Sequence, residues 1–427
     1  MKKFAIIWAG ELISSIGSGM TAFAVAIYIY QLTGSAAMVS TATLLAYLPT
    51  ILLSPVGGIL ADRYDRRLMM ILGDLFSAFG LIYILASIQT GHVGVSPILI
   101  GVTISSVFVS LLEPAYKATV TDLLTKEEYA KASGMVQMAG AAKYLISPFI
   151  AGLILAAADI RVILLIDIST IAVTVLAVAF VRKSIPEKKP RKEDFHFFGE
   201  FREGLKSITG DKGILNLVIL MAFVCFFVAF IQTLMTPMIL SFASAKTLGI
   251  MESISAVGML VGSILIGMIS IKKNYARLLT AALMAAGLFM AMVGTTTNIY
   301  IILAFSILFF TALPFINTSA DVLIRVRIPN EVQGRAWGMI SILTQVGYVA
   351  AYAVCGLLAD HVFGPMMMPD GLLAGSIGNL IGTGEGRGIG LMLIITGIVM
   401  CSFAFVFGRR KCIREIEKRQ NKPVLGV

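Results

Sequence analysis

The residues most suggestive of chemistry lie in the segment GGILADRYDRR, residues 57–67, where two acids and three arginines stand between apolar runs. Gly57 and Gly58 precede these charges and would let another helix approach closely. A carboxylate beside a helix end contributes roughly 0.3–1 kcal/mol, so a few such contacts would hold one conformation and still release it. The segment therefore predicts a conformational latch. An ordinary membrane-edge turn would need the arginines, but not the paired acids or the double glycine.

A second set of candidates consists of charged side chains inside apolar runs. A charge at the centre of a bilayer costs at least ~2.5–3.5 kcal/mol, so such residues are functional candidates. Glu11 lies about two turns into the first run and Lys143 about nine residues into the fifth. We hypothesise that Glu11 titrates and couples proton entry to substrate exit, with Lys143 as its charged partner and Glu113 as the next candidate acid. The alternative is a static ion pair, and Asp167 and Asp321 are interpreted as helix-packing groups.

The elements that must position these residues are apolar runs near the ~20 residues needed to span a bilayer. The chain has 427 residues, of which 58% are hydrophobic and 14% charged. A spanning segment must satisfy its own backbone hydrogen bonds, which favours helices, and the alternating pattern of a membrane barrel is missing. We predict an all-α polytopic membrane protein with twelve spans, at 4–30, 40–61, 68–88, 95–117, 134–157, 160–181, 214–242, 248–271, 276–294, 298–324, 335–363 and 388–408.

The net charge of +10 follows a topological pattern. With the N-terminus inside, 30 of the 34 lysines and arginines lie in cytoplasmic segments. This asymmetry predicts a plasma-membrane protein with both termini in the cytoplasm. The basic residues would then contact anionic inner-leaflet lipids, and no nucleic-acid partner is expected.

Several kinds of chemistry lack their sequence signals. The chain has no G-x-x-x-x-G-K-[ST] motif for nucleotide phosphates, no H-E-x-x-H and no G-x-S-x-G. Its four cysteines form no C-x-x-C pair, so neither a disulfide framework nor a zinc site is indicated. We therefore expect no cofactor, no metal and no enzymatic activity. Energy for any transport would come from an ion gradient or from the gradient of the substrate itself.

The domain organisation follows from one charged, proline-bearing segment. Residues 182–213 separate the twelve runs into six and six, and their second half has the spacing of a short amphipathic helix on the inner leaflet. We predict a six-helix bundle at 1–181, a cytoplasmic linker at 182–213, a second six-helix bundle at 214–408 and a basic tail at 409–427. GGILADRYDRRLM (57–69) aligns with GMISIKKNYARLL (267–279), and YAKASGM (129–135) with QGRAWGM (333–339). These matches indicate an ancient duplication.

The loop motif G-x-L-A-D-R-x-x-R-R resembles the signature loop of the major facilitator superfamily. Three further stretches resemble its branch of macrolide-efflux-type drug exporters, which is related to siderophore exporters and lysophospholipid flippases: PTILLSPVGGILADRYDRRLMMILGD (49–74), EPAYKATVTDLLTKEEYAKASG (113–134) and VRIPNEVQGRAWG (326–338). GEGRGIGLM in the twelfth run fits as well, so the resemblance covers the whole chain. It implies two pseudo-symmetric six-helix bundles that work by alternating access.

The resemblance also implies roles for particular residues. The loop acid of the family interacts with arginines and a helix end, and its position falls on Asp62. The residues of the predicted latch are Gly57, Gly58, Asp62, Arg63, Arg66, Arg67 and Asp74. The chain departs from many drug/proton antiporters in lacking the arginine motif of the fourth helix. The Gly-Pro-x-x-Gly-Gly motif of the fifth helix is reduced to SPFIAG (147–152), which keeps Pro148 and Gly152.

The substrate site is expected near mid-membrane, where the two halves meet. Its candidate residues are Phe23, Tyr28, Tyr144, Phe227, Phe230, Gln232, Phe309 and Asn317. The 22 methionines suit an adaptable cavity. We predict a monomeric secondary transporter that exports small hydrophobic or amphipathic drugs in exchange for protons. The alternatives are a dedicated facilitator or flippase for a siderophore, lysophospholipid or metabolite, and a membrane receptor or sensor that transports nothing.

Overall fold

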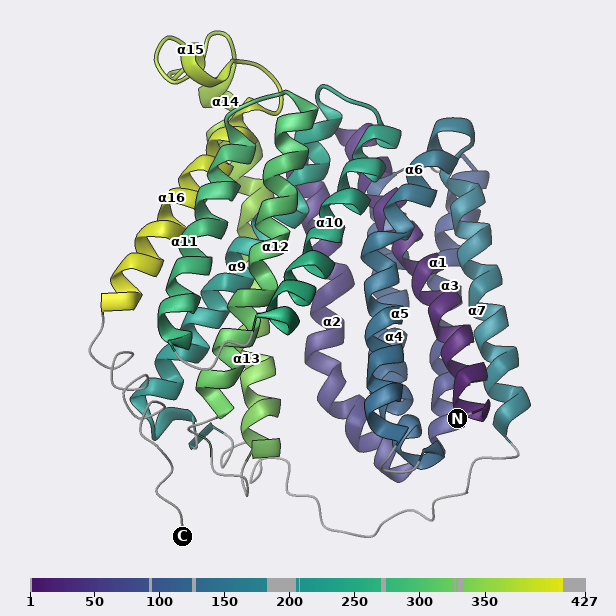
Figure 1. The fold of residues 1–427 in the computed structure, drawn as a ribbon. Coiled ribbons are helices and arrows are strands. Elements are labelled where there is room, and N and C mark those ends of the chain that lie inside the picture. The colour runs from purple at the N-terminus through teal and green to yellow at the C-terminus, as the bar shows by residue number, and fades with distance from the viewer. Residues whose placement is uncertain are drawn as a thin grey trace, which may run out of the picture. The chain divides into compact units, whose positions relative to one another are not determined.

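A computed structural model (Figure 1) describes residues 2–91, 94–124, 128–182, 205–206, 208–269, 274–325, 328 and 333–409. Regular structure in these ranges is helical throughout and contains no strand. Twelve of the described helical spans are long and apolar enough to cross a membrane. This confirms the predicted fold class, and no span edge differs from its predicted position by more than four residues.

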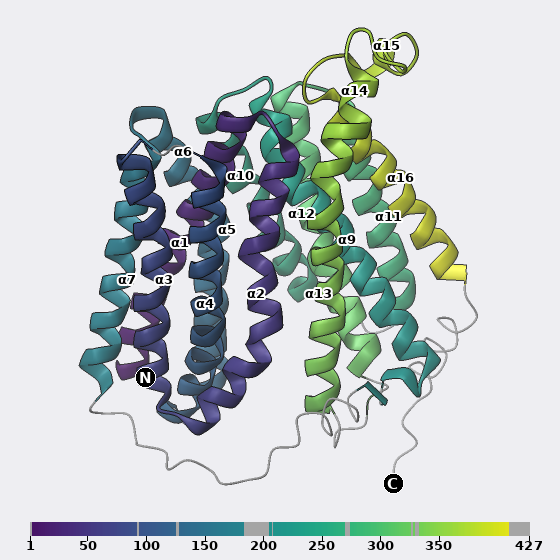
Figure 2. The ribbon, with the colours of Figure 1, turned by 180° about the vertical axis from the view of Figure 1, so that it is seen from behind.

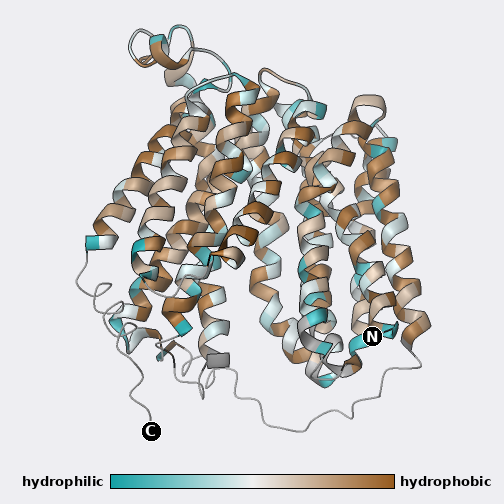
Figure 3. Cartoon of the chain, viewed as in Figure 1, coloured by the Kyte–Doolittle hydropathy of each residue, from teal (hydrophilic) through white to brown (hydrophobic). Residues whose placement is uncertain are grey.

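The described helices have the following bounds. In chain order they are α1 (Lys2–Thr33), α2 (Ala36–Arg63), α3 (Arg66–Gln89), α4 (Val95–Leu123), α5 (Tyr129–Leu145), α6 (Ser147–Ala157), α7 (Ile160–Arg182), α9 (Lys212–Leu240), α10 (Ala245–Met268), α11 (Tyr275–Gly294), α12 (Ile299–Arg325), α13 (Gln333–Leu358), the π-helix η3 (Ala359–Phe363), α14 (Gly364–Met367), α15 (Gly378–Ile381) and α16 (Arg387–Arg409). Hydrophobic residues cover most of the helices, and hydrophilic ones are most frequent near helix ends (Figure 3).

The chain divides into two compact units. Unit 1 holds residues 1–193 together with 243–253, and unit 2 holds 194–242 together with 254–427. Helices α1 to α7 therefore share unit 1 with the first turns of α10. Within unit 1, α1, α3, α4, α5 and α7 run side by side in both views of the chain (Figures 1 and 2). Most of the predicted linker and tail lies outside the described residues.

Side-chain caps set several helix starts. Ser35 precedes α2 and its hydroxyl accepts a hydrogen bond from the Met38 amide at 3.1 Å. Asp211 precedes α9 and its carboxylate accepts from the Gly213 and Ile214 amides at 2.6 and 3.3 Å. Ser and Asp are among the preferred residues at this position because they satisfy backbone donors that have no partner within the helix. The polar residues between apolar runs thus fix where the spans begin.

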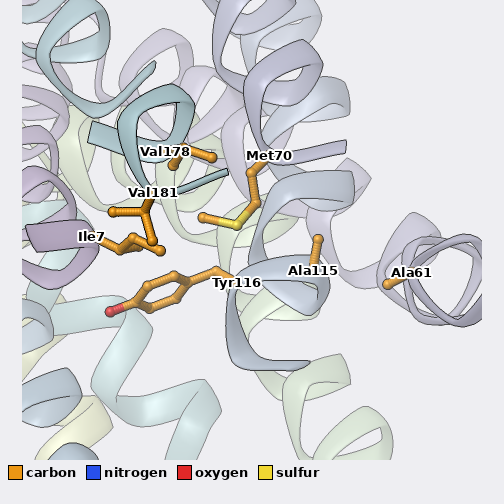
Figure 4. Close-up of a cluster of buried hydrophobic side chains, with 7 residues drawn as sticks. All are labelled: Ile7, Ala61, Met70, Ala115, Tyr116, Val178 and Val181. Atoms are coloured by element: carbon orange, nitrogen blue, oxygen red, sulfur yellow. The ribbon is translucent and has the colours of Figure 1, made fainter. Parts of the chain in front are cut away.

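One end of unit 1 is closed by apolar packing. Ile7, Met70, Tyr116, Val178 and Val181, from α1, α3, α4 and α7, form a buried cluster together with Ala61 and Ala115 (Figure 4). A neighbouring cluster contains Phe4, Leu124 and Ala132. The indole of Trp8 packs beside it and donates to the Met135 carbonyl at 2.5 Å. These contacts hold the beginning of α1 against its neighbours. The cluster also serves as the reference from which the position of other residues along the helices can be counted.

The two units share a packing motif that supports the predicted duplication. In unit 1, α2 meets α4 at Gly57, where a side chain would lie 3.2 Å from Pro114 Cγ. In unit 2, α10 meets α12 at Gly262, where a side chain would lie 3.1 Å from Pro314 Cγ. Each contact joins a glycine of the second spanning helix to a proline inside the fourth. The sequence alignment instead pairs Gly57 with Gly267, which lies five residues beyond Gly262 in α10.

The segment between α13 and α16 is partly ordered by a buried cation. It contains the two four-residue helices α14 and α15. Arg387, at the start of α16, is only 3% exposed. Its guanidinium donates to the carbonyls of Gly294 at 2.8 Å and Thr296 at 3.1 Å, and so ties the start of α16 to the end of α11.

Candidate functional site

The turn between α2 and α3 is built around Asp65. Its carboxylate caps α3 by accepting from the Arg67 amide at 3.0 Å, and it also accepts from Arg67 Nε and Nη2 at 2.7 and 2.8 Å. Arg67 is 7% exposed, which makes this bidentate pair largely buried. Arg66 Nε donates to the Ala61 carbonyl at 2.9 Å and so caps the end of α2. The turn therefore joins the end of α2 to the start of α3 through charged side chains, and its role as a latch stays a prediction.

The predicted latch residues are placed unevenly. Asp62 lies in the last turn of α2, but its side chain is outside the described residues, so its pairing stays a prediction. Arg63 follows it and is exposed. A side chain at Gly57 would lie 2.7 Å from the Ser110 carbonyl oxygen, whereas one at Gly58 would meet no described atom within 4 Å. Of these two positions, only Gly57 must be a glycine for α2 and α4 to pack this closely.

Contacts along α1 give the depth of Glu11. Ile7 packs with Met70 of α3 in the buried cluster. Glu11 and Asp74 each lie four residues further along these two helices, one turn beyond the cluster and at a common level. The two carboxyl groups are within electrostatic range of each other. Asp74 is 6% exposed and lies near Glu11, which is half-buried; its predicted role in the latch stays a prediction.

A third acid lies further along the same bundle. Asp167 of α7 is 2% exposed and accepts from the Thr170 hydroxyl at 3.4 Å. A side chain at Gly17 would lie 2.8 Å from Asp167 Oδ1, which places this carboxylate six residues beyond Glu11 along α1. At 1.5 Å per residue the difference in level is about 9 Å. Asp167 also interacts electrostatically with Asp74, so the three acids follow one another along the bundle.

Lys143 and Glu113 are the candidate partners of Glu11, and both are within electrostatic range of it. Lys143, in the last turn of α5, is half-buried, and its Cγ would lie 2.9 Å from a side chain at Gly19. It is within electrostatic range of both Glu11 and Asp167 but forms no ion pair within 4 Å with either of these described residues. Glu113 of α4 is exposed and also within range of Glu11. Among the described residues, Lys143 therefore lies within electrostatic range of more than one acid, and the proposed titration of Glu11 stays a prediction.

The reduced motif of the fifth span marks a break in that span. Pro148 has no amide hydrogen, and α5 ends at Leu145 before α6 begins at Ser147. The next amide, of Phe149, donates instead to Ser253 Oγ of α10 at 3.0 Å. Gly152 lies within van der Waals distance of Gly249, since a side chain at Gly152 would be 3.3 Å from Gly249 Cα. The motif therefore positions α6 against the part of α10 that belongs to unit 1.

The predicted substrate residues fall into two groups by exposure. Phe23, Phe227, Phe230 and Phe309 are buried, with exposures of 7%, 4%, 4% and 0%. Tyr28 is half-buried. Tyr144 is 58% exposed, and Gln232 and Asn317 are exposed as well. The exposed group offers side chains that a ligand can contact directly, while the buried phenylalanines pack against protein.

Three residues that the sequence interpretation left out belong to these sites. Asp65 was noticed in the charged segment but not assigned to the latch; its place directly before α3 is the signal for a helix cap. Ser253 gave no signal, because a serine in an apolar run usually bonds within its own helix. Glu252 is a further acid inside a span, one residue before Ser253, and is half-buried. Its position near the start of the eighth predicted run made it easy to overlook.

Comparison with known proteins identifies the fold family. The sequence profile of the Major Facilitator Superfamily matches residues 7–352. The chain belongs to the Major Facilitator Superfamily. It is similar to macrolide efflux protein A of Streptococcus pyogenes, with 26% identity over 367 residues that cover 84% of this chain and 90% of that protein. It is similar at 26% identity to macrolide efflux protein A of Enterococcus faecalis, over 71% of this chain and 95% of that protein.

Solved structures agree on the architecture. The crystal structure of the nucleoside transporter NupG is similar with a TM-score of 0.71 over 96% of this chain and all of that one, at 12% identity. At that identity the likeness concerns the fold alone. Together with the twelve apolar spans, the family membership makes this chain a multi-pass membrane transporter.

Proposed function

We propose that this superfamily member is a proton-coupled exporter of small hydrophobic or amphipathic drugs, with macrolide-like compounds as the first substrates to test. The observation that carries the proposal is the position of Glu11, an acid one turn beyond a sealed apolar cluster and surrounded by other ionisable groups. The similarity to two macrolide efflux proteins supports export and the substrate class.

Proton coupling follows from the charge balance around Glu11. A buried charge is tolerated when it is paired, and is otherwise neutralised by gaining or losing a proton. Glu11 faces Lys143 without a direct ion pair and has Glu113 nearby. Protonation of Glu11 would relieve repulsion between these acids and change the charge that Lys143 experiences. An exporter can use that change, since a proton and a cationic or amphipathic drug would then compete for the same electrostatic environment.

The latch contributes by holding one conformation. The Asp65–Arg67 pair and the Arg66 cap fix the α2–α3 turn, and Arg63 is exposed beside it. Contacts of this size are strong enough to favour one state and weak enough to break in each cycle. We assign substrate contact first to Tyr144, Gln232 and Asn317, because their side chains are exposed. We further infer a monomer in the plasma membrane, with both termini cytoplasmic and basic segments on anionic lipid.

The test is transport into proteoliposomes with an imposed pH gradient, acidic inside. The parent protein should accumulate a macrolide as protons leave, and Glu11→Gln should lose this accumulation while keeping gradient-independent drug exchange. Glu385→Gln is the matched control, because Glu385 is exposed in the segment before α16. Asp62→Asn should slow both modes by weakening the latch.

Gradient-driven accumulation by Glu11→Gln at the parent rate would refute the assignment of Glu11. Drug movement by the parent that ignores the pH gradient would favour a facilitator. Movement of a lysophospholipid in place of the drug would favour a flippase.

A further inference from the structure

Asp74 carries a buried polar atom that the structure leaves unpaired. The residue is 6% exposed, and its Oδ2 has no hydrogen-bond partner among the described residues. The Thr21 hydroxyl of α1 is 7% exposed and also lacks a hydrogen bond of good geometry there, although it lies close to the Asp167 carboxylate. Buried polar groups in native proteins are nearly always satisfied, so each exception requires an explanation.

The groups that face Asp74 come from every helix packed around it. Glu11 approaches from α1 and Asp167 from α7. Tyr116, whose hydroxyl also lacks a described partner, and Glu113, both of α4, interact with Glu11. On α3 itself, Arg67 is two turns away and is engaged by Asp65. Lys143 of α5 interacts with Glu11 and Asp167, whereas the charged groups that act on Asp74 are Glu11 and Asp167.

The charge balance of this group favours a bound proton. If Glu11, Asp74 and Asp167 were all ionised, Lys143 would neutralise only one of them. Burying unpaired carboxylates is strongly unfavourable, and neighbouring carboxylates of like charge make it more so. Asp167 receives a hydroxyl hydrogen bond from Thr170, and Glu11 is within range of Lys143. Asp74 has neither kind of support. Among the described residues, no three carboxylates come close enough to share a metal ion.

We propose that Asp74 is a second proton site and that Glu11, Asp74 and Asp167 form a proton relay inside unit 1. Asp74 and Glu11 share one level, and Asp167 lies about 9 Å further along the bundle at 1.5 Å per residue. Over that distance an intervening hydroxyl or water must carry the proton: each O–H bond that breaks on one oxygen is matched by one that forms on the next, so the net charge of the bundle is unchanged until the proton leaves. The Thr21 hydroxyl is beside Asp167 and further along α1, so it can take a proton onward from Asp167. The role in transport rests on the function proposed above; the protonation of Asp74 does not.

Infrared spectroscopy of the whole protein in lipid tests the proton directly. The C=O stretch of a protonated carboxylic acid is separate from the carboxylate bands. The parent at neutral pH should show this band, and Asp74→Asn should lose a component of it. Asp167→Asn should shift the Asp74 component, because it removes a neighbouring acid. Asp159→Asn is the matched control, since Asp159 lies in a short connection, is exposed and pairs with Arg161; it should leave the band unchanged.

The same variants separate this inference from the transport proposal. Asparagine closely mimics a protonated aspartic acid, so Asp74→Asn should fold as well as the parent. A spectrum that keeps every component in Asp74→Asn, or a variant that fails to fold, would overturn the inference. In proteoliposomes, Asp74→Asn should lose pH-driven drug accumulation at least tenfold while Asp159→Asn keeps it. If the parent itself shows no pH-driven accumulation, the proposed function fails, and the infrared result still decides the state of Asp74.

Discussion

Neighbouring glycines at the end of α2 allow a closely controlled test of the latch packing. An alanine at Gly57 would place its Cβ 2.7 Å from the Ser110 carbonyl oxygen and 3.3 Å from Leu111 Cα, both backbone atoms of α4. Backbone cannot move aside as a flexible side chain can, and overpacking of this kind typically costs about 1–3 kcal/mol. The same change at Gly58 would meet no described atom within 4 Å. Replacing a helical glycine by alanine otherwise stabilises the helix by roughly 0.5–1 kcal/mol.

Because both positions lie in one helix, the helix-propensity gain cancels when the two variants are compared. Gly58→Ala should be about as stable as the parent or up to roughly 1 kcal/mol more stable. Gly57→Ala should be less stable than Gly58→Ala by about 1–3 kcal/mol. Denaturant unfolding of the purified protein in micelles, followed by tryptophan fluorescence, measures both values. Equal stabilities for the two variants, or a more stable Gly57→Ala, would refute the close contact between α2 and α4.

Two further predictions concern hydrogen bonds that hold helix ends. Ser253→Ala removes the acceptor of the Phe149 amide at the break between α5 and α6, which should destabilise the protein by about 1–3 kcal/mol in the same unfolding measurement; Ser263→Ala is the control, because the Ser263 hydroxyl bonds within its own helix. Asp65→Asn keeps a good helix cap but removes the charge facing Arg67, whereas Asp65→Ala removes both. Asp65→Ala should therefore be the less stable by about 1 kcal/mol, and equal losses would show that the cap contributes nothing.

The spans could be predicted because the membrane imposes their length and composition. Each helix must be apolar over about 20 residues, a requirement that leaves a mark on the sequence regardless of tertiary structure. The break at Pro148 was not predicted, and the span was expected to run unbroken over 134–157, although proline lacks the amide hydrogen that a continuous helix needs. The partner that satisfies the displaced amide was not visible. Ser253 is about a hundred residues away in the chain, and nothing in a single apolar run indicates which serine will accept a bond from another helix.

Charged residues of the candidate site could be identified from the sequence, but not which of them lie close together in the fold. Glu11 and Lys143 were identified because charges in apolar runs are rare. Asp74 was assigned to the latch because it follows the signature loop closely in sequence. Helix packing instead places it at the level of Glu11, through the contact of Ile7 with Met70. Which acids share a neighbourhood depends on the register between helices, and that register is set by side-chain packing across several elements at once.

The placement of Asp74 on α3 links the buried acids to the turn. Arg67 and Asp74 are seven residues apart, which puts them on one face of the helix and separates them by roughly 10 Å along its axis. At that separation an ionised Asp74 would attract the Arg67 guanidinium by about 1.5 kcal/mol with an effective dielectric constant of 20. Protonation of Asp74 removes this attraction and leaves Arg67 held by the turn residues. Because both residues belong to α3, this attraction acts within one helix, and its loss would leave the bidentate pair between Arg67 and Asp65 at the turn intact.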